Sequence, residues 1–202
     1  MAMTMESFRS LRWADYFLYT ILDPRELYRR VKQKDSNTFV LSFIIPVAYS
    51  IFAILIMSLA GNEGNFFYHK ISYGWILILL YTIFKIIIYS SLIDITAQFF
   101  GYKGNIKEIM TLYNFSLFPE LFLLPAYYTF VTINFAPTFF YVLFSIIFLI
   151  WQVMIFAQSF SEMHSIDFNK SIIILIIPAI SIGLVFFLIA VLIIILAFGF
   201  IV

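Results

Sequence analysis

The sequence contains no cysteine and little charge, and each shortage excludes a class of protein. Without cysteine there can be no disulfide, thiolate zinc site, iron–sulfur cluster or cysteine nucleophile. Charged residues make up 11% of the 202 residues, where about 25% is typical of soluble proteins. A chain with so little polar surface is not expected to be a soluble enzyme, a nucleic-acid-binding protein or a disordered linker.

Hydrophobic residues are in excess, at 63% of the chain against about 45–50% in an ordinary globular protein. A spanning helix needs about 20 mainly apolar residues. Five stretches meet this requirement, and we expect an all-α membrane protein with five spans: residues 39–60, 75–99, 109–133, 138–160 and 172–202. Residues 1–38 precede this transmembrane domain as a basic interfacial segment, which is expected to form short amphipathic helices on the cytoplasmic surface.

The basic residues are unevenly distributed, which predicts the orientation. Seven of the twelve Lys and Arg residues precede Thr38, and Lys103, Lys107 and Lys170 fall on the same side of the predicted membrane. Because cytoplasmic loops carry an excess of Lys and Arg, we expect a cytoplasmic N-terminus and an external C-terminus, in the inner membrane if the source is prokaryotic. No cleavable signal peptide is recognisable, so the first span is expected to serve as a signal-anchor.

The segment from Asp23 to Glu26 has the pattern of a helix start. An Asp cap followed by proline and then Glu three residues on predicts a reciprocal capping box. In the helix that follows, Leu27, Tyr28 and Val31 share one face, as in helices that lie on an anionic membrane surface. The basic residues form either such a recruiting surface or only a topology signal; they are Arg25, Arg29, Arg30, Lys32 and Lys34.

Three ionisable residues, Lys85, Asp94 and Glu120, fall inside predicted spans, where a charge costs at least about 2.5–3.5 kcal/mol. A rise of about 1.5 Å per residue places Lys85 and Glu120 both near the membrane midplane, on antiparallel neighbouring helices. We expect them to face one another as a buried pair. Two alternatives stay open, namely that Lys85 extends to the outer surface or that it serves a ligand or ion.

Asp94 points away from the face of Lys85, so it needs other partners. The same rise places Asp94, Asn114 and Gln152 in one layer of the predicted bundle. These three residues are expected either to hold helices together through hydrogen bonds or to line a polar transport path.

Three prolines fall within the predicted spans. Pro119 and Pro125 are expected to interrupt the third span, because proline removes a backbone hydrogen bond and clashes with the preceding turn. Pro178 is expected to kink the fifth span. A broken helix beside a buried carboxylate also occurs in transporters.

The sequence does not favour an enzyme. Its two histidines, His69 and His164, are predicted on opposite sides of the membrane, so they cannot form one metal site or one acid–base pair. No nucleophile elbow, phosphate loop or dinucleotide fingerprint is present, and no cofactor is expected.

The residues from Asn114 to Pro119, Asn-Phe-Ser-Leu-Phe-Pro, resemble the Gly-Tyr-Ser-Leu-x-Pro motif of the Yip domain family of Ypt/Rab-interacting membrane proteins. Three further segments are similar to this family: the loop from Gly101 to Glu108, the segment from Leu22 to Glu26 and the turn from Phe160 to His164. The segment from Leu22 to Glu26 resembles the start of the prokaryotic members. The resemblance implies five spans and a cytoplasmic N-terminus.

Eukaryotic members of that family associate with small GTPases and with one another in membrane traffic. The present sequence lacks their cytosolic Asp-Leu-Tyr-Gly-Pro motif, which argues against GTPase binding. We therefore expect a non-catalytic membrane scaffold or accessory subunit, bound to membrane lipids and to another membrane protein or to its own copies. The alternative is a small transporter or channel component that uses Lys85, Asp94 and Glu120.

Overall fold

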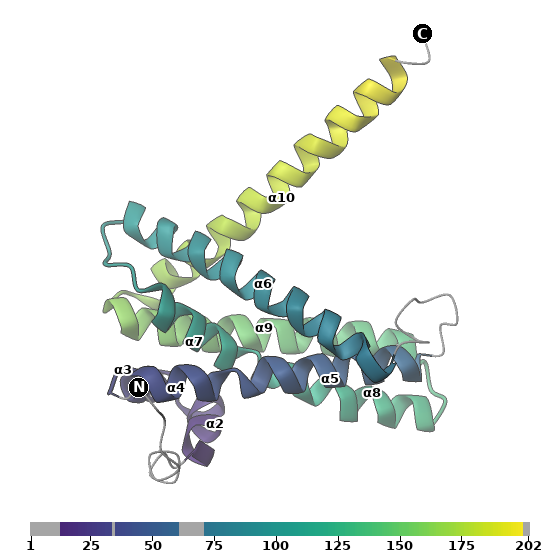
Figure 1. Ribbon diagram of the computed structural model, residues 1–202, viewed down its shortest axis with the longest axis horizontal. Helices are drawn as coiled ribbons and strands as arrows, with labels where there is room; N and C mark the ends of the chain where they lie inside the picture. Colours follow the sequence, from purple (N-terminus) through teal and green to yellow (C-terminus); the bar gives the residue numbers. More distant parts are fainter. Residues whose placement is uncertain (1–12, 34, 61–70, 200–202) are drawn as a thin grey trace.

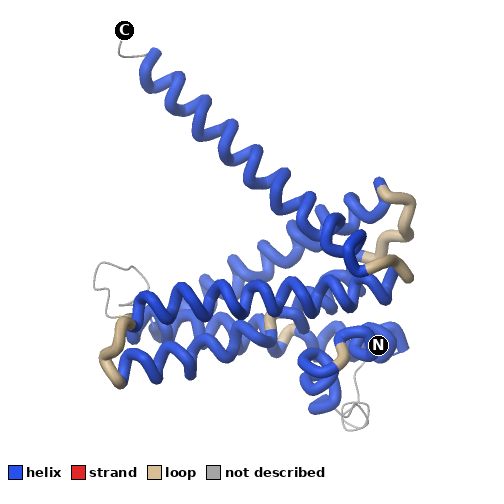
Figure 2. Tube along the Cα trace, turned by 180° about the vertical axis from the view of Figure 1, so that it is seen from behind, coloured by secondary structure: helices blue, strands red, loops and turns tan. Residues whose placement is uncertain are grey.

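The computed structural model describes residues 13–33, 35–60 and 71–199, and within these residues it contains helices and no strand (Figure 2). The predicted all-α class is confirmed. The helices follow one another as α2 (Trp13–Leu22), α3 (Pro24–Gln33), α4 (Asp35–Ser42), α5 (Ile44–Leu59), α6 (Ile71–Phe99), α7 (Ile106–Ser116), the 3-10 helix η2 (Phe118–Phe122), α8 (Leu123–Thr132), α9 (Pro137–His164) and α10 (Phe168–Gly199) (Figure 1).

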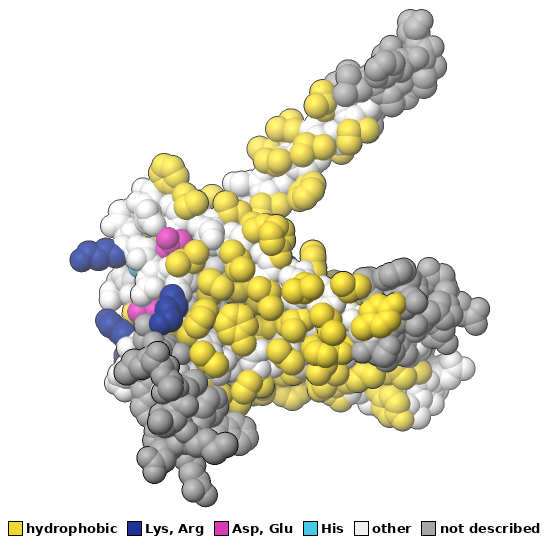
Figure 3. Space-filling model, viewed as in Figure 1, with side chains coloured by type: hydrophobic (Ala, Val, Ile, Leu, Met, Phe, Trp, Pro, Cys, Tyr) yellow, Lys and Arg dark blue, Asp and Glu magenta, His cyan; other side chains and the backbone are white. Residues whose placement is uncertain are grey.

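Five segments of the described residues are long and apolar enough to cross a membrane, which confirms the predicted number. They overlap all five predicted spans and comprise Asn37–Leu59, Tyr73–Phe99, Ile106–Thr132, Pro137–His164 and Phe168–Ile193. Their outer faces are covered with exposed Leu, Ile, Val and Phe side chains, whereas Lys, Arg, Asp and Glu gather at one end of the bundle (Figure 3). Such a surface suits lipid around the bundle and water at its ends.

The two ends of the bundle differ. One end carries the N-terminal helices, the loop at residues 100–105 and the turn at residues 165–167, and we call it the platform end (Figure 1). The opposite end, at residues 133–136, is a short turn between α8 and α9, and we call it the turn end. The largest hydrophobic core lies toward the platform end, where the side chains of Leu27, Val31, Phe115 and Phe160 are fully buried.

The first span consists of two helices, because α4 ends at Ser42 and α5 begins at Ile44. Pro46 explains this break: it has no N–H to give the Ser42 carbonyl, and its ring crowds that carbonyl. The Ser42 hydroxyl instead donates to the Phe39 carbonyl at 2.7 Å. The apolar run of residues 39–60 predicts one continuous helix, and the break at Ser42 differs from that prediction.

The last helix leaves the bundle. The first turns of α10 pack against α6 and α9, but its second half extends away from them (Figure 1). Its large side chains from Leu184 to Ile193 are exposed, with Phe186 at 68%. Within the described residues, no other helix covers these side chains of the fifth span.

Candidate functional site

The turn between α2 and α3 holds the first part of the site, which we call the N-terminal platform (Trp13–Gln33). The Asp23 carboxylate accepts a hydrogen bond from the Glu26 backbone N–H at 3.2 Å, so the predicted cap is confirmed. The reciprocal half of the capping box is wrong, because the Asp23 N–H donates to the Tyr19 carbonyl at 3.0 Å. Because the Asp23 N–H is already bonded within the last turn of α2, the Glu26 carboxylate does not bind it and instead pairs with Arg29 and Arg30.

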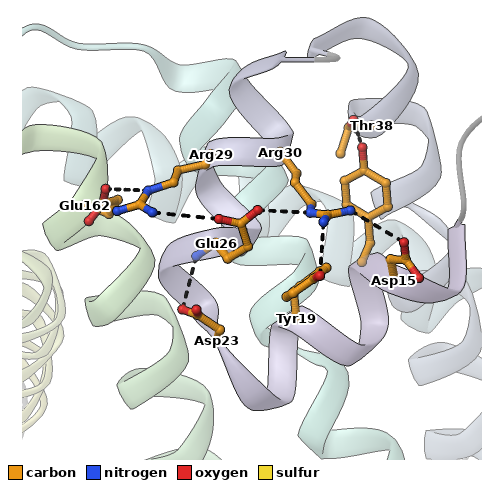
Figure 4. Close-up of polar contacts among 9 residues, drawn as sticks. Asp15, Tyr19, Asp23, Glu26, Arg29, Arg30, Thr38 and Glu162 are labelled. Carbon is orange, nitrogen blue, oxygen red and sulfur yellow. Dashed lines mark hydrogen bonds and ion pairs between the residues drawn. The ribbon is translucent and has the colours of Figure 1, made fainter.

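Arg30 joins the two helices of the platform (Figure 4). Its guanidinium lies 3.2 Å from the Glu26 carboxylate and 3.5 Å from that of Asp15, and it donates to the Tyr19 hydroxyl at 3.0 Å. It also lies 4.2 Å above the centre of the Tyr19 ring. Its planar group thus bridges acids on α2 and α3, a geometry that lysine could not reproduce.

Other contacts fix the platform to α9. The Arg29 guanidinium donates to the Glu162 carboxylate at 3.0 Å, and this neighbour raises the pKa of Arg29 (Figure 4). The buried Ser159 hydroxyl donates to the Pro24 carbonyl at 2.8 Å. Both partners on α9 lie near its end, so the platform is joined to the spans and not only to its own chain neighbours.

The apolar face of α3 is covered by protein, which corrects one prediction. Leu27 and Val31 are 0% exposed, and Tyr28 lies in the same core against α7 and α9. Burial, with the Glu108 carboxylate as a second cause, raises the pKa of Tyr28 to about 12. The expected helix on the lipid surface is therefore wrong for this face, because the bundle buries it first.

The predicted basic residues separate into two groups. Arg29 and Arg30 form the ion pairs described above, whereas Arg25 and Lys32 are exposed and form no ion pair among the described residues. Lys34 lies outside the described residues.

Lys85 and Glu120 lie close enough for their charges to interact. Lys85 projects from α6 and Glu120 from η2, as expected for antiparallel neighbours. They form no direct ion pair, and Lys85 instead lines a pocket between α6, α9 and α10. Lys85 and Glu120 thus interact through their charges but do not form the direct ion pair that was expected.

The expected layer of Asp94, Asn114 and Gln152 is not brought together. Asp94 accepts from the Gln98 amide on its own helix at 2.8 Å. Asn114 is 0% exposed and donates to the Ser42 hydroxyl at 2.9 Å, and Gln152 lies beside Tyr113. Asn114 thus joins two helices, as one of the two alternatives expected, but the three residues do not bond to one another. Rise along a helix gives only the depth of a residue, whereas its partner depends on the direction in which it points.

Asp94 has a neighbour that the sequence analysis missed, since its charge interacts with His164 on α9. The His164 ring lies 4.5 Å from that of Phe160 and 5.5 Å from that of Tyr102. Gly104 lies directly against the carboxylate, so an added Cβ would approach one Asp94 oxygen to 2.7 Å. The distribution of the two histidines excludes a site that both share. It does not exclude a pair between His164 and a carboxylate such as Asp94.

The predicted prolines occupy the interruption of the third span. α7 ends at Ser116, Pro119 lies in η2, and α8 starts two residues before Pro125. Each ring disfavours an α-helical bond to the carbonyl four residues earlier, which accounts for a short 3-10 helix between them. Pro178 lies inside α10, which continues through it.

The platform and the spans described above fall within the match to a single family model. The family model of the Yip1 domain matches residues 18–201, from the middle of α2 almost to the last residue. The chain belongs to the Yip1 domain family. Comparison with curated proteins and with solved structures gave no match. The Yip1 domain thus includes the platform from Leu18 onward as well as the five candidate spans of the described residues.

Proposed function

We propose that this Yip1-domain protein is a non-catalytic membrane scaffold or accessory subunit whose N-terminal platform binds a partner protein on the cytoplasmic side. One observation carries this proposal: Arg29 and Tyr28 hold the platform against α9 and α7, whereas Arg25 and Lys32 are exposed and form no ion pair among the described residues. A fixed surface loses little conformational entropy when it binds, which favours partner recognition.

The charge of the platform end indicates the chemistry of this partner. Arg25 and Lys32 on α3 are exposed, as are Lys103 and Lys170 on the adjoining loop and helix start. The partner is therefore expected to present carboxylates to this surface. The same excess of cations supports a cytoplasmic position for the platform end.

The dispersal of the buried polar residues supports a scaffold over a transporter. Asn114 and Gln152 each bind a different neighbour, and Asp94 lies at the loop beside Gly104. Their contacts join helices at separate points and do not form one continuous polar path.

Purification in mild detergent followed by mass spectrometry tests the proposal. We expect one stoichiometric partner protein with the wild-type chain and with the charge-preserving variant Arg25→Lys/Lys32→Arg. The charge-reversed variant Arg25→Glu/Lys32→Glu is expected to lose it by about tenfold or more, because like charges repel across an interface. Recovery of the chain alone or only with its own copies, or equal recovery from both variants, would contradict the proposal.

A further inference from the structure

A pocket of about 500 Å³ opens on the side of the bundle between α6, α9 and α10. This volume lies within the range of about 300–1,000 Å³ that is usual for small-molecule sites. The pocket is lined by the part of α10 up to Ile182, and the second half of that helix extends away from the bundle (Figure 1). The opening of the pocket therefore faces the hydrocarbon region, and any ligand enters from the lipid.

The walls and the polar groups of the pocket have different chemistry. The walls are apolar side chains of α9 and α10, among them Val153 and Ala179. The polar groups come from Lys85, Tyr89, Tyr113 and Gln152. This combination fits an amphiphile, with an apolar chain along the walls and a polar head at Lys85.

Lys85 is the polar group in this pocket that lacks a direct partner. The Tyr89 hydroxyl donates to the Leu175 carbonyl at 2.7 Å, and Gln152 and Tyr113 lie beside one another. Lys85 makes no hydrogen bond or ion pair with the described residues, and Glu120, its charged neighbour, does not line the pocket. An ammonium group without a contact inside a span is costly, so an anionic head would relieve that cost.

The depth of Lys85 selects the class of amphiphile. Lys85 lies twelve residues after Tyr73 and fourteen before Phe99, so it is about 18 Å along the span at about 1.5 Å per residue. A phospholipid headgroup would have to leave the interface to reach it. A carboxylic acid can enter the bilayer in its neutral form and reach this depth at lower cost.

We propose that this pocket binds a long-chain fatty acid, whose alkyl chain lies between α9 and α10 and whose carboxyl group contacts the Lys85 ammonium. Glu120 then competes with the ligand for the same cation. This site is separate from the N-terminal platform, so it does not depend on the proposed scaffold function.

The test uses a palmitic acid analogue that carries a photoreactive diazirine, added to the full-length protein in mild detergent. We expect labelled residues on the pocket side of α9 and α10, and displacement of the probe by palmitate but not by methyl palmitate. Lys85→Met should weaken labelling by about tenfold or more, because a charge-assisted hydrogen bond is lost, whereas Lys85→Arg should retain it. Glu120→Gln should strengthen labelling.

Ala179→Phe provides a second variant, because it fills the pocket without altering Lys85, and it should abolish the labelling. The proposal is overturned by equal labelling of the wild type and Lys85→Met, or by equal displacement with methyl palmitate. Displacement by phosphatidylglycerol in place of palmitate would overturn it too, as would adducts spread evenly over the lipid-facing helices. Cross-linked pairs of this chain in the pocket, with no labelling by the probe, would assign the pocket to a second copy.

Discussion

Single polar side chains decide how the N-terminal helices are joined to each other and to the spans. Arg30 links α2 to α3 through two acids and a tyrosine hydroxyl, and its side chain is 32% exposed. Arg29 makes one strong contact with Glu162, but its own side chain is 59% exposed. Because exposed ion pairs contribute little, Arg30 is expected to matter more for stability than Arg29.

Arg30→Met should lower the free energy of unfolding by about 1–2 kcal/mol, because the Asp15 and Glu26 carboxylates lose their shared cation. Thermal unfolding in mild detergent measures this change. Arg25→Met is the matched control, since Arg25 lies on the same helix without an ion pair, and it should leave the melting temperature unchanged. Equal losses in the two variants would show that the Arg30 network has no specific role.

Gly104→Ala should destabilise the protein by about 1–3 kcal/mol, because the new methyl group would meet the Asp94 carboxylate and the Gln98 amide. Gly183→Ala is the control, because nothing lies within 4 Å of its Cβ position. A thermal-unfolding comparison should also show a smaller penalty when Asp94→Ala is already present. An unchanged penalty in that background would mean that the carboxylate does not pack against Gly104.

At the scale of helices, some features could be predicted from the sequence and others could not. The break in the third span follows from Pro119 and Pro125, whose effects on a helix are local. The amphipathic pattern of α3 also predicts an apolar face correctly. It does not reveal whether lipid or protein covers that face, and here α7 and α9 cover Leu27 and Val31.

Tyr28, which packs between α3 and α7, should make the stability of the protein depend on pH. Comparison with Tyr28→Phe separates this contribution from that of other groups. Because the pKa of Tyr28 is raised from 10.0 to about 12 in the folded protein, its stabilising contribution is complete below pH 10 and is lost as the pH rises through 12. Thermal unfolding should show wild type more stable than Tyr28→Phe at pH 8, with a gap that narrows above pH 10. A gap that stays constant to pH 11 would contradict the burial of this hydroxyl against Glu108.

At the scale of the whole molecule, composition and hydrophobic run length were enough to predict five spans. The arrangement of their polar residues was not predictable in the same way. Asp94, Asn114 and Gln152 lie at similar depths, but helix rotation and the break at Ser42 give Asn114 a partner on another span. The proximity of His164 to Asp94 was not predictable for a related reason. A single sequence does not show that the end of α9 lies near Asp94 on α6.

The orientation of the molecule is testable because the chain has no native cysteine. We expect Phe135→Cys, at the turn end, to react with a membrane-impermeant maleimide in intact cells. Lys32→Cys, on the platform, should react only after permeabilisation, because the positive-inside bias places it in the cytoplasm. The reverse pattern of labelling would contradict this orientation.

Photo-cross-linking in intact cells tests the proposed scaffold most directly. A photoreactive amino acid replaces Lys32 on the platform in one variant and Phe135 at the turn end in another. The scaffold proposal predicts one discrete adduct with a different protein from position 32 and none from position 135. Adducts only with lipid or with the chain's own copies, or the same protein adduct from both positions, would contradict the claim that the platform binds a partner.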